Sequence, residues 1–182
     1  MIKEFVFAGF GGQGVLTAGM LLANTAAIND MEVSWIPSYG SEMRGGTANC
    51  VVKIGDEVAP SPFAKYLDVL IAMNGPSLAK FGGMVKKGSG VIIVNSSVVH
   101  EVPEYADVKV IAIPMVELTM KHENERGANI VAVGAAVGAS DIMPREMMTA
   151  GIETYFAKYC KNNAKNIAVF NEGYDLARKE LA

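Results

Sequence analysis

Two glycine-rich segments contain the residues of this chain that are best suited to binding a ligand. The first, residues 9–14, reads GFGGQG and matches the spacing G-x-G-x-x-G of phosphate-binding turns. A turn of this kind between a strand and a helix leaves backbone N–H groups unpaired at the positive end of the helix dipole, where an anion is favoured. Gly11 and Gly12 would also let a ligand approach the backbone closely. We therefore expect a ligand or a subunit interface at Gly9, Gly11, Gly12, Gln13 and Gly14.

Three interpretations of the first segment stay open: a dinucleotide site, a site for another phosphate-bearing ligand, and a purely structural tight turn. A dinucleotide site also needs an acidic residue at the end of the second strand to bind the ribose hydroxyls. Asp30 and Glu32 lie at about the expected 20 residues from the turn, but they precede or begin that strand. Its C-terminal end reads Pro37-Ser38-Tyr39 instead, so the NAD interpretation lacks a required residue.

The second segment, residues 37–49, combines an aromatic ring, a carboxylate and a guanidinium with three glycines. Arg44 is a planar, permanently charged fork suited to a carboxylate or a phosphate. The segment follows a strand, so in a doubly wound sheet it should lie at the same edge as the first segment, where ligands bind. It is either a solvated loop or a loop that reaches a ligand or a partner subunit. The candidate residues in it are Ser38, Tyr39, Gly40, Glu42, Arg44, Gly45 and Gly46.

Other catalytic arrangements are missing from the sequence. The chain has two cysteines, Cys50 and Cys160, and two histidines, none at metal-ligand spacing. An iron–sulfur cluster held by four thiolates therefore cannot form within this chain alone. We expect no catalytic residue and no metal site in the isolated chain, and we expect both cysteines to be buried thiols.

The elements that position these segments alternate between strand and helix, which is typical of a parallel sheet covered by helices. Apolar runs predict strands at 5–8, 32–36, 48–54, 68–73, 91–94 and 108–113. Helical periodicity predicts helices at 15–28, 77–85, 129–139, 143–159 and 171–181. In the third of these helices, Gly134 and Gly138 indicate close packing against another backbone. The expected fold class is α/β, a Rossmann-like, doubly wound, mostly parallel sheet with helices on both faces, in one domain spanning 1–182.

Composition narrows the class of protein. Hydrophobic residues make up 51% of the chain and charged residues 19%, which favours an ordered globular chain. The net charge is −3 with both signs interspersed, so we expect no nucleic-acid partner. The longest apolar stretch, 129–139, is far shorter than the roughly 20 residues of a membrane span. The N-terminal apolar run is too short for a signal peptide, and we expect a cytoplasmic protein with no membrane partner.

The two glycine-rich segments together resemble a known family. GGQGV at 11–15, followed by PSYGSEMRGGTAN at 37–49, is similar to the gamma subunit of 2-oxoacid:ferredoxin oxidoreductases. The resemblance extends over essentially the whole chain, including Ser61-Pro62 and the helix near 129–138. MRGGT at 43–47 is closer to the 2-oxoglutarate type than to the pyruvate type, which tends to read RRGAP. Branched-chain 2-oxoacid enzymes and indolepyruvate oxidoreductase stay open as alternatives.

The resemblance implies coenzyme A-dependent oxidative decarboxylation of a 2-oxoacid to acyl-CoA and CO2, with reduction of ferredoxin. It places thiamine diphosphate, Mg2+ and iron–sulfur clusters on partner subunits, alpha and beta with delta as an option, and makes coenzyme A a co-substrate. This chain would bind none of these cofactors alone; it would be a non-autonomous oxidoreductase subunit that contributes to assembly and to the coenzyme A side. Arg44 is the expected anion contact. The alternative is an independent nucleotide- or anion-binding Rossmann-like domain.

Overall fold

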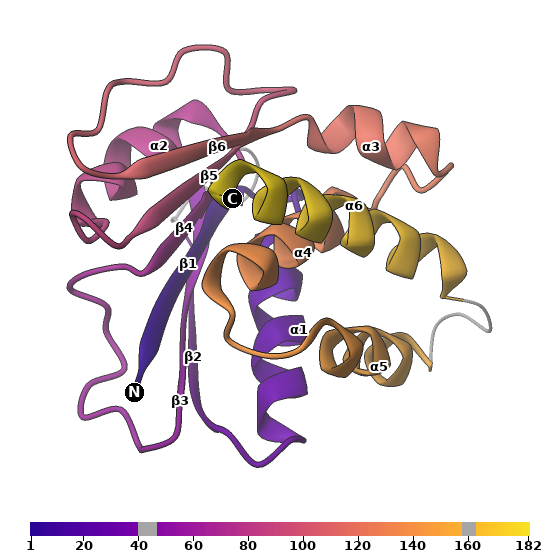
Figure 1. The fold of residues 1–182 in the computed structure, drawn as a ribbon, viewed down its shortest axis with the longest axis horizontal. Coiled ribbons are helices and arrows are strands. Elements are labelled where there is room, and N and C mark those ends of the chain that lie inside the picture. The colour runs from indigo at the N-terminus through magenta and orange to yellow at the C-terminus, as the bar shows by residue number, and fades with distance from the viewer. Residues whose placement is uncertain (40–46, 158–162) are drawn as a thin grey trace.

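The computed structural model of the protein describes residues 1–39, 47–157 and 163–182 (Figure 1). The strands are β1 (Lys3–Phe10), β2 (Glu32–Tyr39), β3 (Thr47–Gly55), β4 (Val69–Ala72), β5 (Val91–Asn95) and β6 (Lys109–Ile113). The helices are α1 (Val15–Ala27), α2 (Gly75–Phe81), the short 3-10 helix η1 (Gly82–Met84), α3 (Met115–Lys121), α4 (Ala128–Ser140), α5 (Arg145–Phe156) and α6 (Ala164–Leu181).

The strands form one sheet in the order β2-β3-β1-β4-β5-β6. β1, β4, β5 and β6 pair in parallel, whereas β3 is antiparallel to both of its neighbours, β1 and β2. The predicted mostly parallel α/β sheet is therefore confirmed, with β3 as the exception. Ala48 lies opposite Gly9 on one side and opposite Tyr39 on the other. β1 and β2 therefore end at the same edge of the sheet, the edge formed by the C-terminal ends of the parallel strands.

Helices cover both faces of the sheet, as expected (Figure 1). α1, α4, α5 and α6 pack on the face that buries Phe5 and Phe7, and α2 lies on the face that buries Val6. β4 and β5 are buried along their whole length. Burial on both faces explains why these two strands read as unbroken apolar runs rather than as alternating sequences.

Several boundaries differ from the sequence-based expectation. β2 continues through Pro37 to Tyr39 instead of stopping at the proline, which is tolerated because β2 is an edge strand. α3 was not expected; it is held by Met115 and Thr119, one turn apart and both buried. The sequence predicts the last two helices at 143–159 and 171–181, but α5 spans Arg145–Phe156 and α6 already begins at Ala164.

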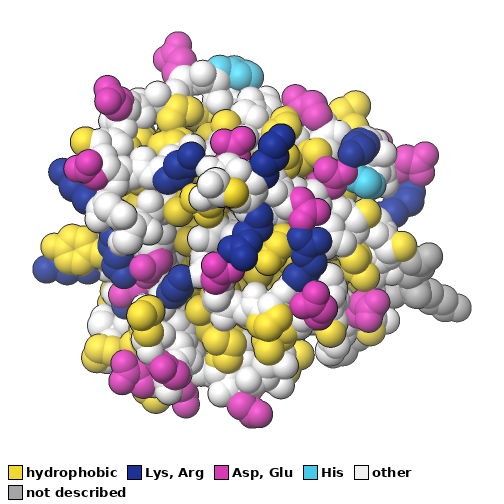
Figure 2. All heavy atoms as spheres, in the orientation of Figure 1, with side chains coloured by type: hydrophobic (Ala, Val, Ile, Leu, Met, Phe, Trp, Pro, Cys, Tyr) yellow, Lys and Arg dark blue, Asp and Glu magenta, His cyan; other side chains and the backbone are white. Residues whose placement is uncertain are grey.

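The protein surface mixes charges of both signs. Figure 2 shows Lys and Arg side chains interspersed with Asp and Glu over one face, with apolar side chains between them. This face carries no extended patch of one sign, in agreement with the small net charge of −3. Within the described part of the chain, no helix combines the length and the apolar character that crossing a membrane requires.

Glycines bring α4 and α6 into direct backbone contact. A Cβ added at Gly134 would lie 2.0 Å from the carbonyl oxygen of Phe170, and one added at Gly173 would lie 2.1 Å from the carbonyl oxygen of Val131. A Cβ at Gly138 would meet the carbonyl oxygen of Tyr174 at 2.6 Å. The close helix packing expected from Gly134 and Gly138 is confirmed, and α6 is the partner.

Gly134→Ala should lower the free energy of unfolding by about 3 kcal/mol, because the new methyl group meets rigid backbone rather than a side chain that can move. Gly83→Ala is the matched control, since a Cβ at Gly83 meets nothing within 4 Å. Urea denaturation of the two variants and the parent chain measures the difference. Equal losses in the two variants would contradict close α4–α6 contact.

Candidate functional site

The first glycine-rich segment forms the loop between β1 and α1, at the edge of the sheet where the parallel strands end. Gly12 and Gly14 have φ angles of 98° and 72°, in the left-handed region that favours glycine. Gly9 is required for a different reason: a Cβ there would lie 2.6 Å from Oε1 of Gln13 and 2.9 Å from Cβ of Met73. The loop therefore follows a path that larger residues would obstruct.

Gln13 fastens this loop to the neighbouring strand. Its Oε1 accepts the backbone N–H of Phe10 at 2.6 Å, and its Nε2 donates to the carbonyl oxygen of Met73 at 3.0 Å. Oε1 also accepts from Nδ2 of Asn74 at 3.3 Å. Both polar atoms of Gln13 are thus used inside the protein. Gln13 therefore holds the glycine loop against Met73, the residue that follows β4.

The loop lies at the switch point of the sheet. β1 leads into α1 on one face, whereas its parallel neighbour β4 leads into α2 on the other face. Doubly wound sheets bind their ligands in the crevice that opens where the winding reverses. Here a cavity of about 510 Å3 opens at that point, between the glycine loop, the ends of β4 and β5 and the start of α4. We call it the switch-point cavity.

The strand order is incompatible with the geometry that a dinucleotide site requires. β3 lies between β1 and β2, so the end of β2 is two strand spacings, about 10 Å, from the end of β1. Asp30 and Glu32 lie at the start of β2, at the opposite edge of the sheet from the glycine loop. The ribose contact typical of that class therefore has no counterpart at these positions.

The second glycine-rich segment begins where β2 ends. Ser38 and Tyr39 lie at the same edge of the sheet as the glycine loop, as expected, and Tyr39 is 72% exposed. Gly40, Glu42, Arg44, Gly45 and Gly46 lie outside the described residues. Their role as a ligand or partner loop stays a prediction.

Three asparagines outside the two glycine-rich segments complete the site. Asn74 caps α2, where its Oδ1 accepts the N–H of Ser77 at 2.8 Å. Asn95 ends β5 and lines the switch-point cavity. Asn129, in the first turn of α4, donates from Nδ2 to the carbonyl oxygen of Gly14 at 3.4 Å. Asn74 and Asn95 could have been identified from the sequence, because each directly follows a buried apolar run. Nothing in the sequence distinguishes Asn129 from a residue that only packs in the core.

The polar groups deep in the site are therefore amides and backbone groups, while Glu125 and Arg126 are exposed residues that also line the cavity. Carboxamides do not titrate, so they can orient a ligand but cannot act as general acid or base. No group of three or more His, Cys, Asp or Glu in the described ranges could hold a metal ion. Cys50 is fully buried, and desolvation raises the pKa of its thiol to about 12, which excludes it as a nucleophile near neutral pH.

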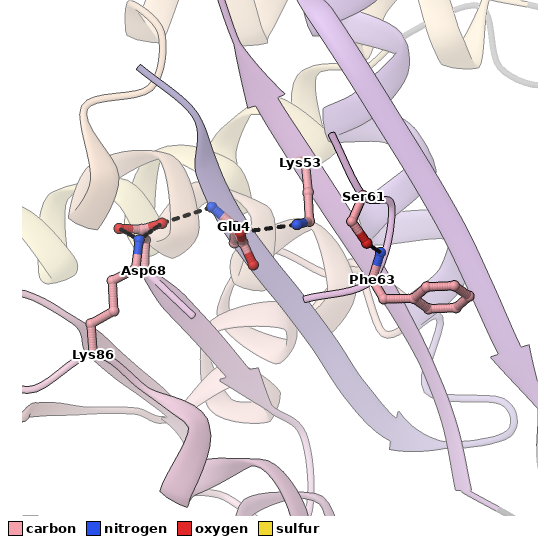
Figure 3. Close-up of polar contacts among 6 residues, drawn as sticks. All are labelled: Glu4, Lys53, Ser61, Phe63, Asp68 and Lys86. Atoms are coloured by element: carbon pink, nitrogen blue, oxygen red, sulfur yellow. Dashed lines mark hydrogen bonds and ion pairs between the residues drawn. The ribbon is translucent and has the colours of Figure 1, made fainter. Parts of the chain in front are cut away.

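Charged side chains meet at the other end of the sheet instead (Figure 3). Nζ of Lys53 lies 2.9 Å from Oε1 of Glu4, and the Lys53 side chain is 7% exposed. The backbone N–H of Glu4 donates to Oδ2 of Asp68 at 2.8 Å, and Asp68 pairs with Lys86 at 2.8 Å. These contacts join the starts of β1, β4 and β5 to β3. They are structural, and none of these four residues lines the switch-point cavity.

The turn that contains Ser61 lies outside the candidate site too. Oγ of Ser61 accepts the backbone N–H of Phe63 at 3.3 Å, and the ring of Phe63 is exposed (Figure 3). Ser61 thus shapes the segment between β3 and β4.

Gln13→Leu should lower the free energy of unfolding by about 2 kcal/mol, because it leaves the N–H of Phe10 and the carbonyl of Met73 without their partner. Thr154→Ala, which removes an exposed side-chain bond to the carbonyl of Ala150, is the control and should change stability by about 0.5 kcal/mol or less. Urea denaturation measures both. If Gln13→Leu were as stable as the parent chain, the clamp between β1 and β4 would be refuted.

Cys50 should resist thiol reagents in the folded protein. At pH 8 a thiol with a pKa of about 12 is ionised to roughly one part in ten thousand, and its sulfur is buried. In a Cys160→Ser variant, we expect no reaction with a chromogenic disulfide until urea is added, and then one equivalent. Reaction of the folded variant at the rate of free cysteine would show that the interior around α1 and β3 opens readily.

Comparison with known proteins identifies relatives across nearly the whole chain. Residues 4–176 match the family model described as pyruvate ferredoxin/flavodoxin oxidoreductase. Ketoisovalerate oxidoreductase subunit VorA of Methanothermobacter marburgensis is 36% identical over 176 residues, which cover 96% of this chain and 36% of VorA. The 2-oxoglutarate synthase subunit KorC of Methanocaldococcus jannaschii is 33% identical over 183 residues, covering 98% of this chain and 96% of KorC. This chain thus spans about a third of VorA and nearly all of KorC.

A solved structure supports the same assignment. The gamma subunit of the keto/oxoacid ferredoxin oxidoreductase from Geobacter sulfurreducens is similar with a TM-score of 0.79 and 28% identity, over 96% of this chain and 98% of that one. The family model covers far more than half of the chain, and both relatives named above exceed 30% identity over nearly all of it. The chain therefore belongs to the pyruvate ferredoxin/flavodoxin oxidoreductase family, and its fold is that of the gamma subunits of 2-oxoacid:ferredoxin oxidoreductases.

Proposed function

We propose that this chain is the gamma subunit of a complex that oxidatively decarboxylates a 2-oxoacid with coenzyme A, yielding acyl-CoA and CO2 and reducing ferredoxin. The observation that carries the proposal is the near full-length similarity to KorC, a subunit of about the same length. The switch-point cavity agrees with a supporting role, because amides and glycines form much of its lining and no cysteine, serine or histidine of the described residues lines it as a nucleophile.

The chemistry is assigned to partner subunits. Two cysteines are too few for a cluster held by four thiolates, so the electron carriers belong on other chains. The family resemblance would place thiamine diphosphate and Mg2+ on partner subunits as well, alpha and beta with delta as an option. Ferredoxin then reaches this chain only through the complex.

The contribution of this chain is an interface at the edge where β1 and β2 end. Tyr39 presents an exposed aromatic ring there, of the kind that is enriched in protein interfaces. Arg44 follows it in the sequence and supplies the fork for a coenzyme A phosphate, a substrate carboxylate or a partner's acid. The glycine loop, including Gly11 and Gly12, completes this interface on the β1 side.

We propose 2-oxoglutarate as the substrate, from MRGGT at 43–47. Overall similarity does not separate the alternatives, because the relatives that act on ketoisovalerate and on 2-oxoglutarate have similar identities of 36% and 33%. The substrate pocket would lie mainly on a partner subunit, where the thiamine cofactor would bind.

Capture of the chain from its native extract tests the proposal. The recovered material is assayed for coenzyme A-dependent reduction of a viologen dye with 2-oxoglutarate, ketoisovalerate, pyruvate and indolepyruvate. Recovery with thiamine- and cluster-binding chains, and fastest reduction with 2-oxoglutarate, is the expected result. Faster reduction with ketoisovalerate would overturn the substrate, and recovery of the chain alone with no activity would favour an independent anion-binding domain instead.

Arg44→Ala should raise KM for coenzyme A or weaken recovery of the partner chains by about tenfold, the value of one lost charge-assisted contact. Lys87→Ala is the control, since it removes an exposed charge from the turn before β5, at the opposite edge of the sheet. Enzyme kinetics and quantitative co-purification measure the two effects. A variant that matched the parent complex in both would rule out the role of Arg44.

A further inference from the structure

We propose that residues 58–66, between β3 and β4, form a docking surface for the partner subunit that corresponds to the part of VorA outside this domain. The proposal rests on the function given above and adds a contact that is separate from the edge where β1 and β2 end. We call this region the 58–66 surface; its exposed side chains are Val58, Phe63, Lys65 and Tyr66.

The 58–66 surface groups apolar side chains that face solvent. Val58 is 74% exposed, Phe63 70% and Tyr66 57%. No other stretch of nine described residues holds more than two exposed large apolar side chains. A single exposed apolar residue is ordinary, but a group that includes two aromatic rings is typical of a site that binds another protein.

The backbone that carries these side chains is fixed to the domain. Leu67 is fully buried; its N–H donates to the carbonyl oxygen of Met84 at 2.9 Å, and its own carbonyl oxygen accepts the N–H of Lys86 at 2.9 Å. Ala64 packs against the core cluster that contains Leu70. The rings are therefore held at the surface before a partner binds, which lowers the entropy that binding costs.

The domain offers these rings no apolar surface of its own. Glu4 lies opposite Lys53, and Lys53 lies opposite Ser34, so the three side chains form a polar row on the face of the sheet that also buries Val6. Figure 3 shows the ring of Phe63 pointing away from Lys53 and Glu4. Burial of the ring is favourable only against apolar groups, so the apolar surface has to come from another molecule.

The sizes of the relatives indicate which molecule this is. The domain makes up 36% of VorA, whereas KorC is a subunit of which 96% is covered by this chain. In VorA the domain is therefore joined covalently to a further polypeptide. As a separate subunit, which we proposed above, this chain needs a non-covalent contact with the counterpart of that polypeptide.

Lys65 favours such a partner over a second copy of this chain. It is exposed between Phe63 and Tyr66, its Nζ lies 5.4 Å from the centroid of the Tyr66 ring, and it has no ion pair among the described residues. A two-fold contact through this surface would bring the ammonium groups of two Lys65 side chains together. A different subunit can instead offer an apolar pocket for Phe63 with a carboxylate beside it for Lys65.

Site-specific photo-cross-linking tests the docking surface. The tagged full-length chain with Phe63→p-benzoylphenylalanine is expressed in place of the native chain, irradiated and recovered, and cross-linked peptides are identified by mass spectrometry. We expect cross-links to a chain similar to the part of VorA outside this domain. Ile28→p-benzoylphenylalanine is the control, because Ile28 is also an exposed apolar residue but follows α1, on the opposite face of the sheet; it should give no such cross-link.

The unsubstituted chain separates the two ways in which this test can fail. If it co-purifies with the partner, then cross-links from position 63 to a second copy of this chain, to an unrelated protein or to nothing overturn the docking surface alone. Equal cross-linking from position 28 does the same. If the unsubstituted chain recovers no thiamine- or cluster-binding chain, the proposed function fails and the docking surface fails with it.

Substitutions measure the strength of the contact. Phe63→Ser and Tyr66→Ser should each weaken recovery of the partner by at least about tenfold, because buried aromatic anchors supply most of the binding energy of an interface. Ile28→Ser should leave recovery within about twofold. The urea midpoint of each isolated variant should match that of the parent chain, since the exposed rings contribute little to folding. A midpoint that falls together with recovery would show that the rings stabilise their own domain and would refute docking.

Discussion

The hydrogen bonds of one carboxamide hold the functional edge of this protein together. Gln13 bonds to the backbone at the end of β1 and at the end of β4, the two strands between which the sheet reverses its winding. A switch point separates the segments that leave the sheet in opposite directions, so the crevice there tends to open. The side chain of Gln13 spans the floor of this crevice. It positions the glycine loop, the start of α1 and the residue that caps α2.

The start of α4 completes the site from the other end of the chain, and its position follows from backbone packing. Gly134 and Gly173 let α4 and α6 approach until a methyl group would no longer fit between them. That contact fixes α4 on the sheet, and Asn129 in its first turn then reaches the carbonyl of Gly14. Glycines at a distance from the cavity thus decide where an amide in the cavity lies.

The two ends of the sheet carry different kinds of polar group. The ion pairs of Glu4 with Lys53 and of Asp68 with Lys86 lie where β1, β4 and β5 begin, while amides and glycines lie where these strands end. Buried full charges need fixed partners, whereas amides and uncapped N–H groups can exchange water for a ligand at small cost. Such an edge is adapted to bind or to dock, and it leaves covalent chemistry to groups that titrate.

The sequence by itself determined the α/β class, the six strands, the glycine loop after β1 and the common edge at which this loop and the end of β2 lie, because apolar runs and glycine spacing are local properties of the chain. It did not determine that β3 is inserted antiparallel between β1 and β2, which separates the glycine loop from the end of β2. It also gave no reason to place Asn95 and Asn129 in the wall of one cavity, with Asn74 bonded to Gln13 beside it. Strand order and the meeting of residues far apart in the chain depend on long-range packing, so only the tertiary structure decided them.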